Sequence, residues 1–463
     1  MRLRKKLKSS PMHYITVKQP NIILVVLDTM RIDGLGCYNP KVNTPNFNAF
    51  CSQAVVYRNA IAPSPWTVPS HASMFTGKYP SDHGVHENMN EKVFPKIFET
   101  MSSISYSTLA EELRRAGYNT FGLTSNATIM PGTGFDRGFN SYMYNSGPID
   151  THIYELFVKF ATMIKQKYGS TSKLIKGMLS PGELIGYFRR YRAMRRELES
   201  LGFPMKKGGD SLVQQVSNSS FETPLFMFLN FMEMHKPYMT MYRRMRRYSG
   251  VGLWITLLNQ MGRLDQKIIE STRNDYYKEA ELLDSYFGRL LKYLKDQGVY
   301  ESSLIIVTSD HGQSLLESGF FGHGIYLHDE LVRVPLIIKY PGEPLPDDGY
   351  FNIKDIFRLA LSASRSEPLS ELLRDVTFSE SFGSNVNVSD LEGMTEQQRN
   401  AVMKMAAPRK AVFKSGYKLV VNGLDGSIEE FTYNGKIADR KMANDLIDEL
   451  RVFRGRQKFV LPG

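Results

Sequence analysis

The stretch NIILVVLD, residues 21–28, decides how the rest of the chain is interpreted. Its apolar part runs from Ile22 to Leu27 and ends directly at Asp28. An apolar run of this length is far too short to cross a bilayer, but it is typical of a strand buried on both faces of a parallel sheet. The sequence therefore predicts a buried strand that carries a carboxylate at its end.

Four further runs follow the same pattern and alternate with helical segments. They are YNTFGLTSN (118–126), LFMFLNFMEMH (225–235), LIIVTSDHG (304–312) and VPLIIKYPG (334–342). Between them, Thr108 and Glu111 have the capping-box spacing of a helix start, and a longer helical pattern runs from about residue 274 to residue 297. This alternation predicts an α/β fold with a largely parallel sheet covered by helices on both faces.

The pattern also divides the chain into regions. We expect a basic N-terminal arm at 1–19, a catalytic α/β domain at 20–345 with a helical insertion at about 151–221, and a small C-terminal α+β subdomain at 346–463. In the last region, KAVFKSGYKLVVNG (410–423) and SIEEFTYNG (427–435) predict a small antiparallel sheet, and residues 441–452 predict a final helix.

The charge balance favours anionic ligands or surfaces. The 463 residues carry a formal net charge of +11, and basic runs lie at 1–10, 189–207 and 243–247, where we expect solvated faces. No apolar segment follows the basic N-terminus, and with only Cys37 and Cys51 no disulfide framework supports the fold, which favours a cytoplasmic location. The inner, anionic membrane face is a candidate peripheral partner, whereas the absence of a nucleic-acid motif excludes nucleic acid from the expected partners.

Polar residues follow the predicted strands at the points where they end. Ligands of open parallel sheets bind at the carboxyl edge of the strands, so these side chains are expected to converge. Two carboxylates and an imidazole are a suitable set for a divalent metal, provided that the strands concerned are neighbours. The alternative for each residue is a turn or a helix cap. The residues are Asp28, Asn126, His235, Asp310 and His311.

The stretch SPWTVPSHASMFTGKYP, residues 64–80, places one hydroxyl, that of Thr67, directly before a predicted helix start at about residues 68–70. A threonine hydroxyl is a poor nucleophile at neutral pH unless a base, a metal or a positive dipole stabilises its alkoxide. The free amides of a helix N-terminus supply part of that stabilisation. Thr67 is therefore a candidate nucleophile, with a simple N-cap as the alternative.

In chain order these motifs resemble the sulfatase-like branch of the alkaline phosphatase superfamily, over about residues 20–342. The resemblance implies a metal-dependent hydrolase or transferase that acts on a phosphate or sulfate ester, either a small molecule or one linked to a glycan or lipid. The motifs are Asp28 with the following GLGCY, TVPSHASMFTGKYP (67–80), GYNT (117–120), EMHKPY (233–238), SDHG (309–312) and RVPLII (333–338).

The departures from the family pattern favour a direct threonine mechanism. The Cys or Ser that sulfatases convert to formylglycine corresponds to Thr67, and Thr cannot be converted to that aldehyde. The resemblance then implies a phosphoester hydrolase or phosphotransferase with a covalent phospho-Thr67 intermediate. A sulfatase of the same fold and a non-catalytic anion-binding protein are the alternatives.

The resemblance also implies the residues of the site. A single divalent metal ion is expected, zinc or manganese in preference to calcium or magnesium, because His311 stands where Asn is common. Two-metal members carry a His four residues after an Asp, but Gly288 follows Asp284 at that spacing. The expected metal ligands are Asp28, Thr67, Asp310 and His311. The expected catalytic residues are Thr67, His71, His235 and His323, and the expected substrate contacts are Ser70 and Asn126.

Overall fold

The computed structural model describes part of the chain in detail. The described residues are 19–86, 94–145, 206–236, 238, 266–342, 346, 349–368, 372–383, 396, 400, 404, 407–439, 443–453 and 461. Most of the predicted basic arm, the predicted helical insertion up to residue 205 and the basic run 243–247 lie outside these residues.

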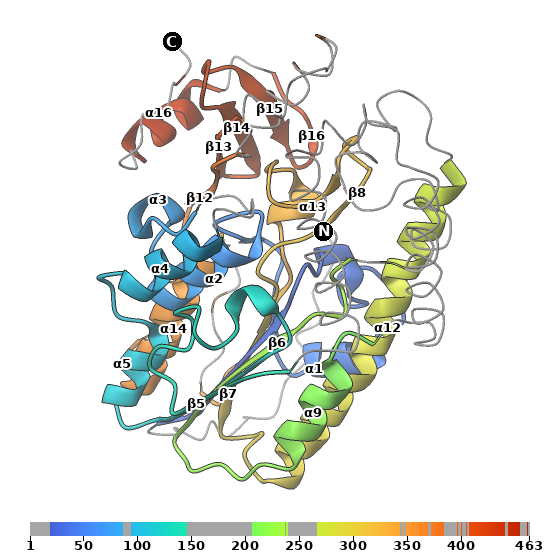
Figure 1. Ribbon diagram of the computed structural model, residues 1–463. Coiled ribbons are helices and arrows are strands. Elements are labelled where there is room, and N and C mark those ends of the chain that lie inside the picture. Colours follow the sequence, from blue (N-terminus) through green and yellow to red (C-terminus); the bar gives the residue numbers. More distant parts are fainter. Residues whose placement is uncertain are drawn as a thin grey trace, which may run out of the picture.

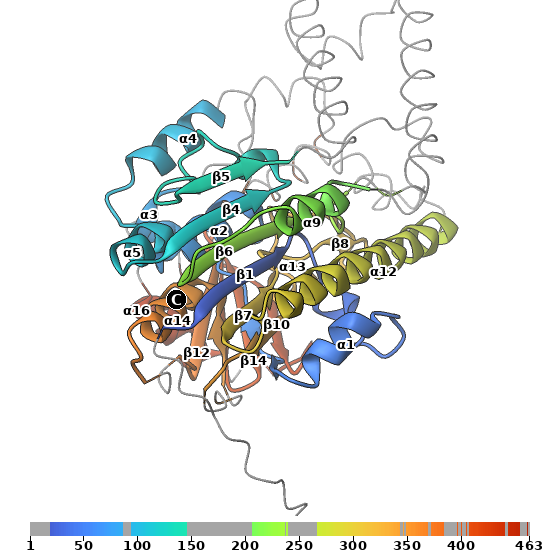
Figure 2. The same cartoon turned by 90° about the horizontal axis from the view of Figure 1, so that it is seen from below.

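Within the described residues the main sheet has seven strands in the order β2-β10-β7-β1-β6-β4-β5. Strand β1 pairs in parallel with β6 and β7, and β4 pairs in parallel with β5 and β6, so the predicted largely parallel sheet is confirmed (Figure 2). The last predicted strand, β10, differs because it runs antiparallel to both β7 and β2. The strands are β1 Asn21–Leu27, β2 Val55–Tyr57, β4 Asn119–Thr124, β5 Ser141–Tyr144, β6 Leu225–Phe231, β7 Ser303–Thr308 and β10 Leu336–Lys339.

Helices cover both faces of this sheet, as the continuous apolar run of β1 requires (Figure 1). Because side chains alternate along a strand, Ile22, Leu24 and Val26 enter one core and Ile23, Val25 and Leu27 enter the other. The first core lies against α2 Thr67–Thr76, α5 Leu109–Arg115 and α14 Ile356–Ser364. The second lies against α1 Pro45–Cys51, α9 Gly209–Ser217 and α12 Gln266–Asp296.

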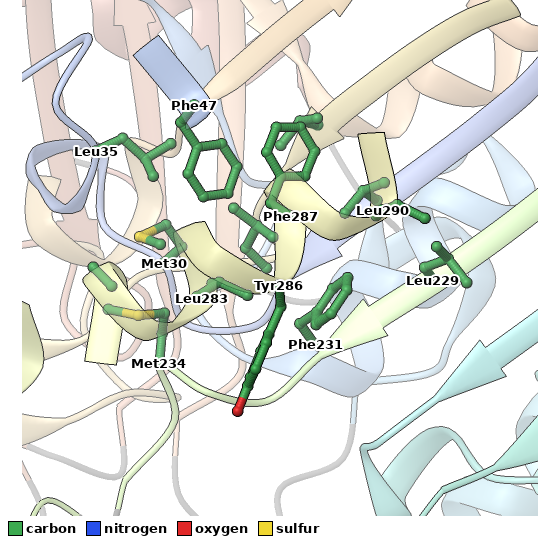
Figure 3. Close-up of a cluster of buried hydrophobic side chains, with 14 of the residues drawn as sticks. Met30, Leu35, Phe47, Leu229, Phe231, Met234, Leu283, Tyr286, Phe287 and Leu290 are labelled. Carbon is green, nitrogen blue, oxygen red and sulfur yellow. The ribbon is translucent and has the colours of Figure 1, made fainter. Parts of the chain in front are cut away.

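The second core is built around α12, which begins earlier than its sequence pattern indicated, at Gln266. Figure 3 shows Phe287 of this helix beside Phe47, and the two rings stack with centroids 4.2 Å apart. The Asp284 carboxylate on the same helix accepts the backbone N–H groups of Asn46 and Phe47 at 3.2 and 2.8 Å. Asp284 is therefore a tertiary cap for the N-terminus of α1, and it is not part of a metal site.

The predicted start of α5 is confirmed. The Thr108 hydroxyl accepts the Glu111 N–H at 3.2 Å, and the Glu111 carboxylate accepts the Thr108 N–H at 2.8 Å. The other helix on this side with a predicted start, α2, begins one residue earlier than expected, at Thr67 itself, with Trp66 as the N-cap residue. The alternative role of Thr67 as an N-cap is therefore wrong.

The predicted C-terminal antiparallel sheet is confirmed, and Figure 1 shows it beyond one end of the main sheet. Its strands, in order, are β12 Val376–Ser381, β13 Arg409–Lys414, β14 Tyr417–Asn422, β15 Ile428–Tyr433 and β16 Lys436–Ile437. The final helix, α16, spans Asn444–Val452 and packs on β13 and β14. Residues 351–363 instead pack into the first core, where Phe351 and Ile356 are fully buried.

Short elements connect these layers. They are β3 Ala60–Ile61, paired with β11 Phe351–Asn352, β8 Ser314–Leu315, paired with β9 Phe321–Gly322, and the helices α3 Pro80–His83, α4 Phe94–Ser103 and α13 Asp329–Val332. The 3-10 helices are η1 Ile32–Gly34, η2 Ala127–Ile129 and η3 Ile353–Asp355. Among the described helices, none combines the length and the apolar character that a bilayer crossing requires.

Candidate active site

The carboxyl edge of the main sheet holds three of the predicted metal ligands. Asp28 follows β1 and Asp310 follows β7, and these two strands are direct neighbours. One ligand atom from each of Asp28, Asp310 and His311 can be chosen so that all three lie within 4.8 Å of one another, and all three residues are buried. The metal site predicted from the sequence required these two strands to be neighbours, and they are.

The Asp310 carboxylate is held in place on one side only. Its Oδ1 atom accepts the backbone N–H groups of Thr29 at 3.2 Å and His311 at 2.9 Å. Its Oδ2 atom accepts no hydrogen bond of ordinary geometry from the described residues, and burial raises the pKa of Asp310 to about 7. A buried carboxylate oxygen of this kind is costly unless a cation faces it. The donor set fits a divalent metal ion.

The loop after β1 is strained where it meets this carboxylate. Thr29 has φ +59°, a left-handed conformation that a β-branched residue rarely adopts. That conformation directs the Thr29 N–H to Asp310, and the Thr29 carbonyl accepts the hydroxyl of Tyr276 at 3.0 Å. Backbone strain of this size persists only where surrounding contacts enforce it, and it is concentrated at functional sites.

The two expected substrate contacts lie at the site but are engaged with the protein. The Asn126 side-chain amide donates to Oδ2 of Asp28 at 2.6 Å, and its oxygen accepts the Thr128 N–H at 2.8 Å. The Ser70 hydroxyl donates to the Asp310 carbonyl at 2.6 Å. Both residues therefore orient the segments that carry the candidate metal ligands.

Thr67 lies beside this group, at the first residue of α2. Its hydroxyl is 3.2 Å from Nε2 of His311. Nδ1 of His311 lies 2.8 Å from the Gly312 carbonyl, which can only accept, so Nδ1 carries the ring proton and Nε2 presents a lone pair. The Thr67 hydroxyl can therefore donate to His311, and it also interacts with the Asp310 carboxylate, where it opposes the rise in pKa.

Two further histidines adjoin His311. The ring centroid of His323 lies 4.6 Å from that of His311 and 5.1 Å from that of His235. Nδ1 of His235 donates to the Lys236 carbonyl at 2.7 Å, and Nδ1 of His323 donates to the side-chain oxygen of Gln313 at 2.7 Å. Each Nε2 atom thus remains available to a ligand, and we refer to His235, His311 and His323 as the histidine cluster.

Sequence reasoning missed Lys236, the lysine of the site, whose pKa is lowered by burial. A Cβ atom built on Gly322 would lie 3.8 Å from its Nζ atom, so the side chain reaches the strand that precedes His323. Burial and this positive charge lower the pKa of His235 to about 3, and the charge contributes to lowered pKa values at His311 and His323. Its position next to His235, at the end of a buried strand, was the signal available in the sequence.

His71 does not lie where the sequence predicted. It is fully buried, with its ring edge-to-face with those of Phe75, Phe135 and Phe228. Nδ1 lies 3.0 Å from the Thr67 carbonyl and 3.5 Å from Oδ2 of Asp310, and burial lowers the pKa of His71 to about 3. In this geometry His71 is a neutral residue that supports Asp310 and the first turn of α2, and its expected contact with the substrate stays a prediction.

The chain is similar to known proteins in sequence and in fold. A family model described as Sulfatase matches residues 20–364. An arylsulfatase from Clostridium perfringens is 24% identical, with 71% of this chain and 70% of the relative covered. An N-acetylgalactosamine-6-O-sulfatase from Bacteroides thetaiotaomicron is also 24% identical, with 76% and 74% covered. A phosphonate monoester hydrolase from Silicibacter pomeroyi shares the fold, with a TM-score of 0.57, 18% identity and 94% of both chains covered.

Proposed function

This chain belongs to the Sulfatase family, within the hydrolases of the alkaline phosphatase superfamily, and from that membership we propose that it hydrolyses sulfate esters with unmodified Thr67 as the nucleophile. The observation that carries the proposal is the position of the Thr67 hydroxyl, 3.2 Å from Nε2 of His311 and beside the buried carboxylates of Asp28 and Asp310. A hydroxyl beside two buried carboxylates at a helix N-terminus is explained if a metal cation binds the carboxylates and an anionic ester binds next to the hydroxyl.

Asp28, Asp310 and His311 are the residues that would hold the metal. Family members bind a divalent metal, and a set of two carboxylates and one imidazole suits zinc or manganese better than calcium or magnesium. When bound, such an ion would lower the pKa of a neighbouring hydroxyl and neutralise charge on the ester oxygens. Asn126 and Ser70 keep Asp28 and Asp310 in position for it.

The reaction proceeds as a double displacement on this chain's own residues. The Thr67 oxygen attacks sulfur, the bond between sulfur and the ester oxygen breaks, and the proton of Thr67 passes to His235 or His323, since His311 would hold the metal. Because Nδ1 of His235 and of His323 is already bonded, Nε2 is the atom that accepts this proton and then gives it to the departing alcohol. Water then attacks the sulfo-threonine and releases sulfate, which restores Thr67.

The anion is bound by charge and by backbone dipoles. Lys236 supplies a positive charge close to His323. The free amides in the first turn of α2 favour negative charge at the same place. The relative named as an N-acetylgalactosamine-6-O-sulfatase makes a sulfated sugar the first substrate to test.

Phosphate esters are a second candidate, and Thr67 favours them specifically. A threonine alkoxide transfers a phosphoryl group without prior conversion to an aldehyde. The same residues would then act on phosphorus, through a phospho-Thr67 intermediate with the same movement of protons. Assays of both ester classes with the same purified protein decide between sulfur and phosphorus.

The test uses the purified chain with 4-nitrophenyl sulfate, 4-nitrophenyl phosphate and a 6-sulfated amino sugar, with zinc, manganese, calcium or magnesium added in turn. Thr67→Ala is expected to lower kcat by roughly 1000-fold or more while the protein keeps its fold. Thr76→Ala is the matched control, because Thr76 lies at the other end of α2 and donates only to the Ala72 carbonyl. An acid-quenched reaction should add about 80 Da to the peptide with Thr67, and accurate mass distinguishes sulfate from phosphate.

Equal rates in Thr67→Ala and the unaltered protein would show that Thr67 is not the nucleophile. An adduct on another residue would assign the nucleophile elsewhere. The larger kcat/KM of the two ester classes decides between the first and second candidate.

A further inference from the structure

A cavity of about 350 Å³ lies at the end of α2 that is remote from Thr67. Its walls come from Thr76 and Gly77 of that end, from residues 106 and 107, and from the segment where η3 passes into α14. Figure 1 shows α2 and α14 side by side, and the two helices are in contact. Because a helix rises by about 1.5 Å per residue, the cavity lies about 14 Å from Thr67 along the axis of α2. It is therefore separate from the candidate active site, and its volume suits a small ligand.

Basic side chains outnumber acidic ones around this cavity. Asp355 is the single acid among the described lining residues, and its Oδ1 atom accepts Nζ of Lys354 at 2.6 Å and Nη2 of Arg374 at 3.0 Å. Its Oδ2 atom accepts Nε of the same arginine at 3.0 Å. One carboxylate is thus shared by two cations, and Lys78 and Arg358 add further positive charge. The lining carries an excess of positive charge that the chain's own acid does not balance.

Lys354 is the buried cation of the cavity. Its side chain is only 8% exposed, and its Nζ atom lies 4.9 Å from the ring centroid of Tyr79. Burial lowers the pKa of Lys354, Asp355 opposes this, and the positive charges of Arg374 and Lys78 add to the lowering. Cations that oppose each other's protonation in this way are stabilised when an anion binds between them.

The walls of the cavity are held by close packing. The chain leaves α2 at Gly77, which has φ +68° and donates its N–H to the Ser73 carbonyl at 2.8 Å. A Cβ atom built on Gly77 would lie 3.0 Å from the ring of Phe357, so α14 closes tightly on this turn. The basic side chains therefore extend from fixed elements, which lowers the cost of arranging them around a ligand.

The open side of the cavity offers further donors. Lys78 is exposed, and its Nζ atom lies 5.4 Å from the ring centroid of Tyr106. Within the described residues, the Ser107 hydroxyl only accepts a hydrogen bond, from Arg115 at 3.0 Å, so its own proton can be donated to a ligand. A lysine and a hydroxyl beside two arginines are donors typical of a site for an oxyanion.

We propose that this cavity is a second anion site, which binds a phosphate or sulfate group that does not react. A dianion would balance the excess positive charge and gain charge-assisted hydrogen bonds from Lys78, Arg358 and Arg374. Two sources share this chemistry, the free phosphate or sulfate ion and a phosphate or sulfate ester of a sugar. The proposal goes beyond the proposed function and does not depend on whether Thr67 is the nucleophile.

Equilibrium dialysis of the full-length, metal-loaded protein against radiolabelled inorganic phosphate or sulfate, at constant ionic strength, tests the proposal. The double variant Lys78→Met with Arg358→Met removes two exposed cations from the cavity and should weaken the binding of one anion per chain roughly 10-fold or more. Lys41→Met with Lys436→Met is the matched control, because both lysines are exposed and neither lines the cavity. An anion held near Thr67 binds equally in all three proteins and cancels in the comparison.

A second measurement uses the unaltered protein alone. Saturating phosphate should slow the acetylation of Lys78 by acetic anhydride, measured by peptide mass analysis, and leave the acetylation of Lys41 unchanged. Competition by glucose 6-phosphate and glucose 6-sulfate identifies the source of the group. Tighter binding than the free ions assigns the site to an ester, and weaker binding assigns it to the ion.

Three outcomes would overturn the proposal. The first is equal anion affinity in the unaltered protein and the variant at Lys78 and Arg358. The second is equal weakening in the control variant, because binding then follows the total charge of the protein. The third is unchanged acetylation of Lys78 at saturating phosphate, a result that does not depend on how any variant folds.

Discussion

The two large sheets of the molecule both bury charged side chains, but the surroundings of these side chains differ. In the C-terminal sheet, buried Lys418 lies 2.9 Å from carboxylate oxygens of both Asp329 and Glu430, and buried Arg409 lies 2.6 Å from Glu429. At the carboxyl edge of the main sheet, two carboxylates lie together with a histidine whose pKa is lowered. One region pairs opposite charges within the chain, and the other gathers like charges.

The difference separates support from function. A buried ion pair is complete in the folded chain, so it holds two segments together and needs no further group. A buried pair of acids lowers stability unless something from outside completes it. The C-terminal sheet shows that this chain can pair its buried charges. The like charges gathered at the carboxyl edge of the main sheet therefore mark the candidate site.

Asp310→Asn should lower the activity and at the same time raise the stability of the metal-free protein. Hydrolysis is expected to fall roughly 1000-fold or more, because the metal group loses a carboxylate. The metal-free protein should nevertheless become more stable, by about 2 kcal/mol near pH 8, because a buried carboxylate with a raised pKa is replaced by a neutral amide. Activity assays and denaturant titrations in a chelator measure the two effects.

Glu380→Gln is the matched control. Glu380 is as deeply buried as Asp310, but it lies 3.2 Å from Lys410 and accepts the Ser81 N–H at 2.9 Å. This substitution should lower the free energy of unfolding by about 3 kcal/mol. If both variants were destabilised to the same degree, the distinction between the two regions would be lost.

Lys418→Met tests the paired region directly. Removal of the ammonium leaves Asp329 and Glu430 facing each other, and the free energy of unfolding should fall by about 3 kcal/mol while kcat is unchanged. Lys436→Met, at an exposed position on β16, should change stability by less than about 0.5 kcal/mol. A drop in kcat in Lys418→Met would mean that this network also controls the site.

A metal should stabilise the protein through the carboxyl edge of the main sheet and leave the ion pairs of the C-terminal sheet unaffected. At a free concentration about 100 times its Kd, zinc or manganese should raise the free energy of unfolding by about 2.7 kcal/mol. Calcium and magnesium should do less, and Asp310→Asn should abolish the effect that Lys418→Met retains. Thermal melts with chelator and with each ion give the result, and a greater gain with calcium would contradict the assignment based on His311.

His83 provides the smallest expected effect, through pH. It is buried, its Nδ1 accepts the Val85 N–H at 3.0 Å, and burial lowers its pKa from 6.5 to about 3. The unfolded chain therefore binds a proton below pH 6.5 that the folded chain does not, so stability is full above pH 6.5 and falls as pH decreases towards 3. His83→Gln should reduce the loss between pH 6.5 and pH 5 by about 2 kcal/mol. Equal slopes for both proteins would show that the pKa of His83 is not lowered in the folded chain.

The sequence alone determined five of the seven strands of the main sheet, all but β2 and β5, and the candidate metal ligands. Apolar runs such as residues 22–27 can satisfy their backbone groups and bury their side chains only inside a covered sheet. Since parallel strands end at one edge, the residues after β1 and β7 had to meet once the strands were neighbours. Spacing within about ten residues was enough for these conclusions, and for the capping box at Thr108 and Glu111.

The tertiary structure alone decided the partners that lie far apart in the chain. Asp284 caps α1 across more than two hundred residues, Lys236 reaches Gly322, and His71 packs among three phenylalanine rings. The antiparallel direction of β10 belongs to the same group. The direction of a side chain depends on which helix or strand packs over it, and a local pattern carries no information about that long-range choice.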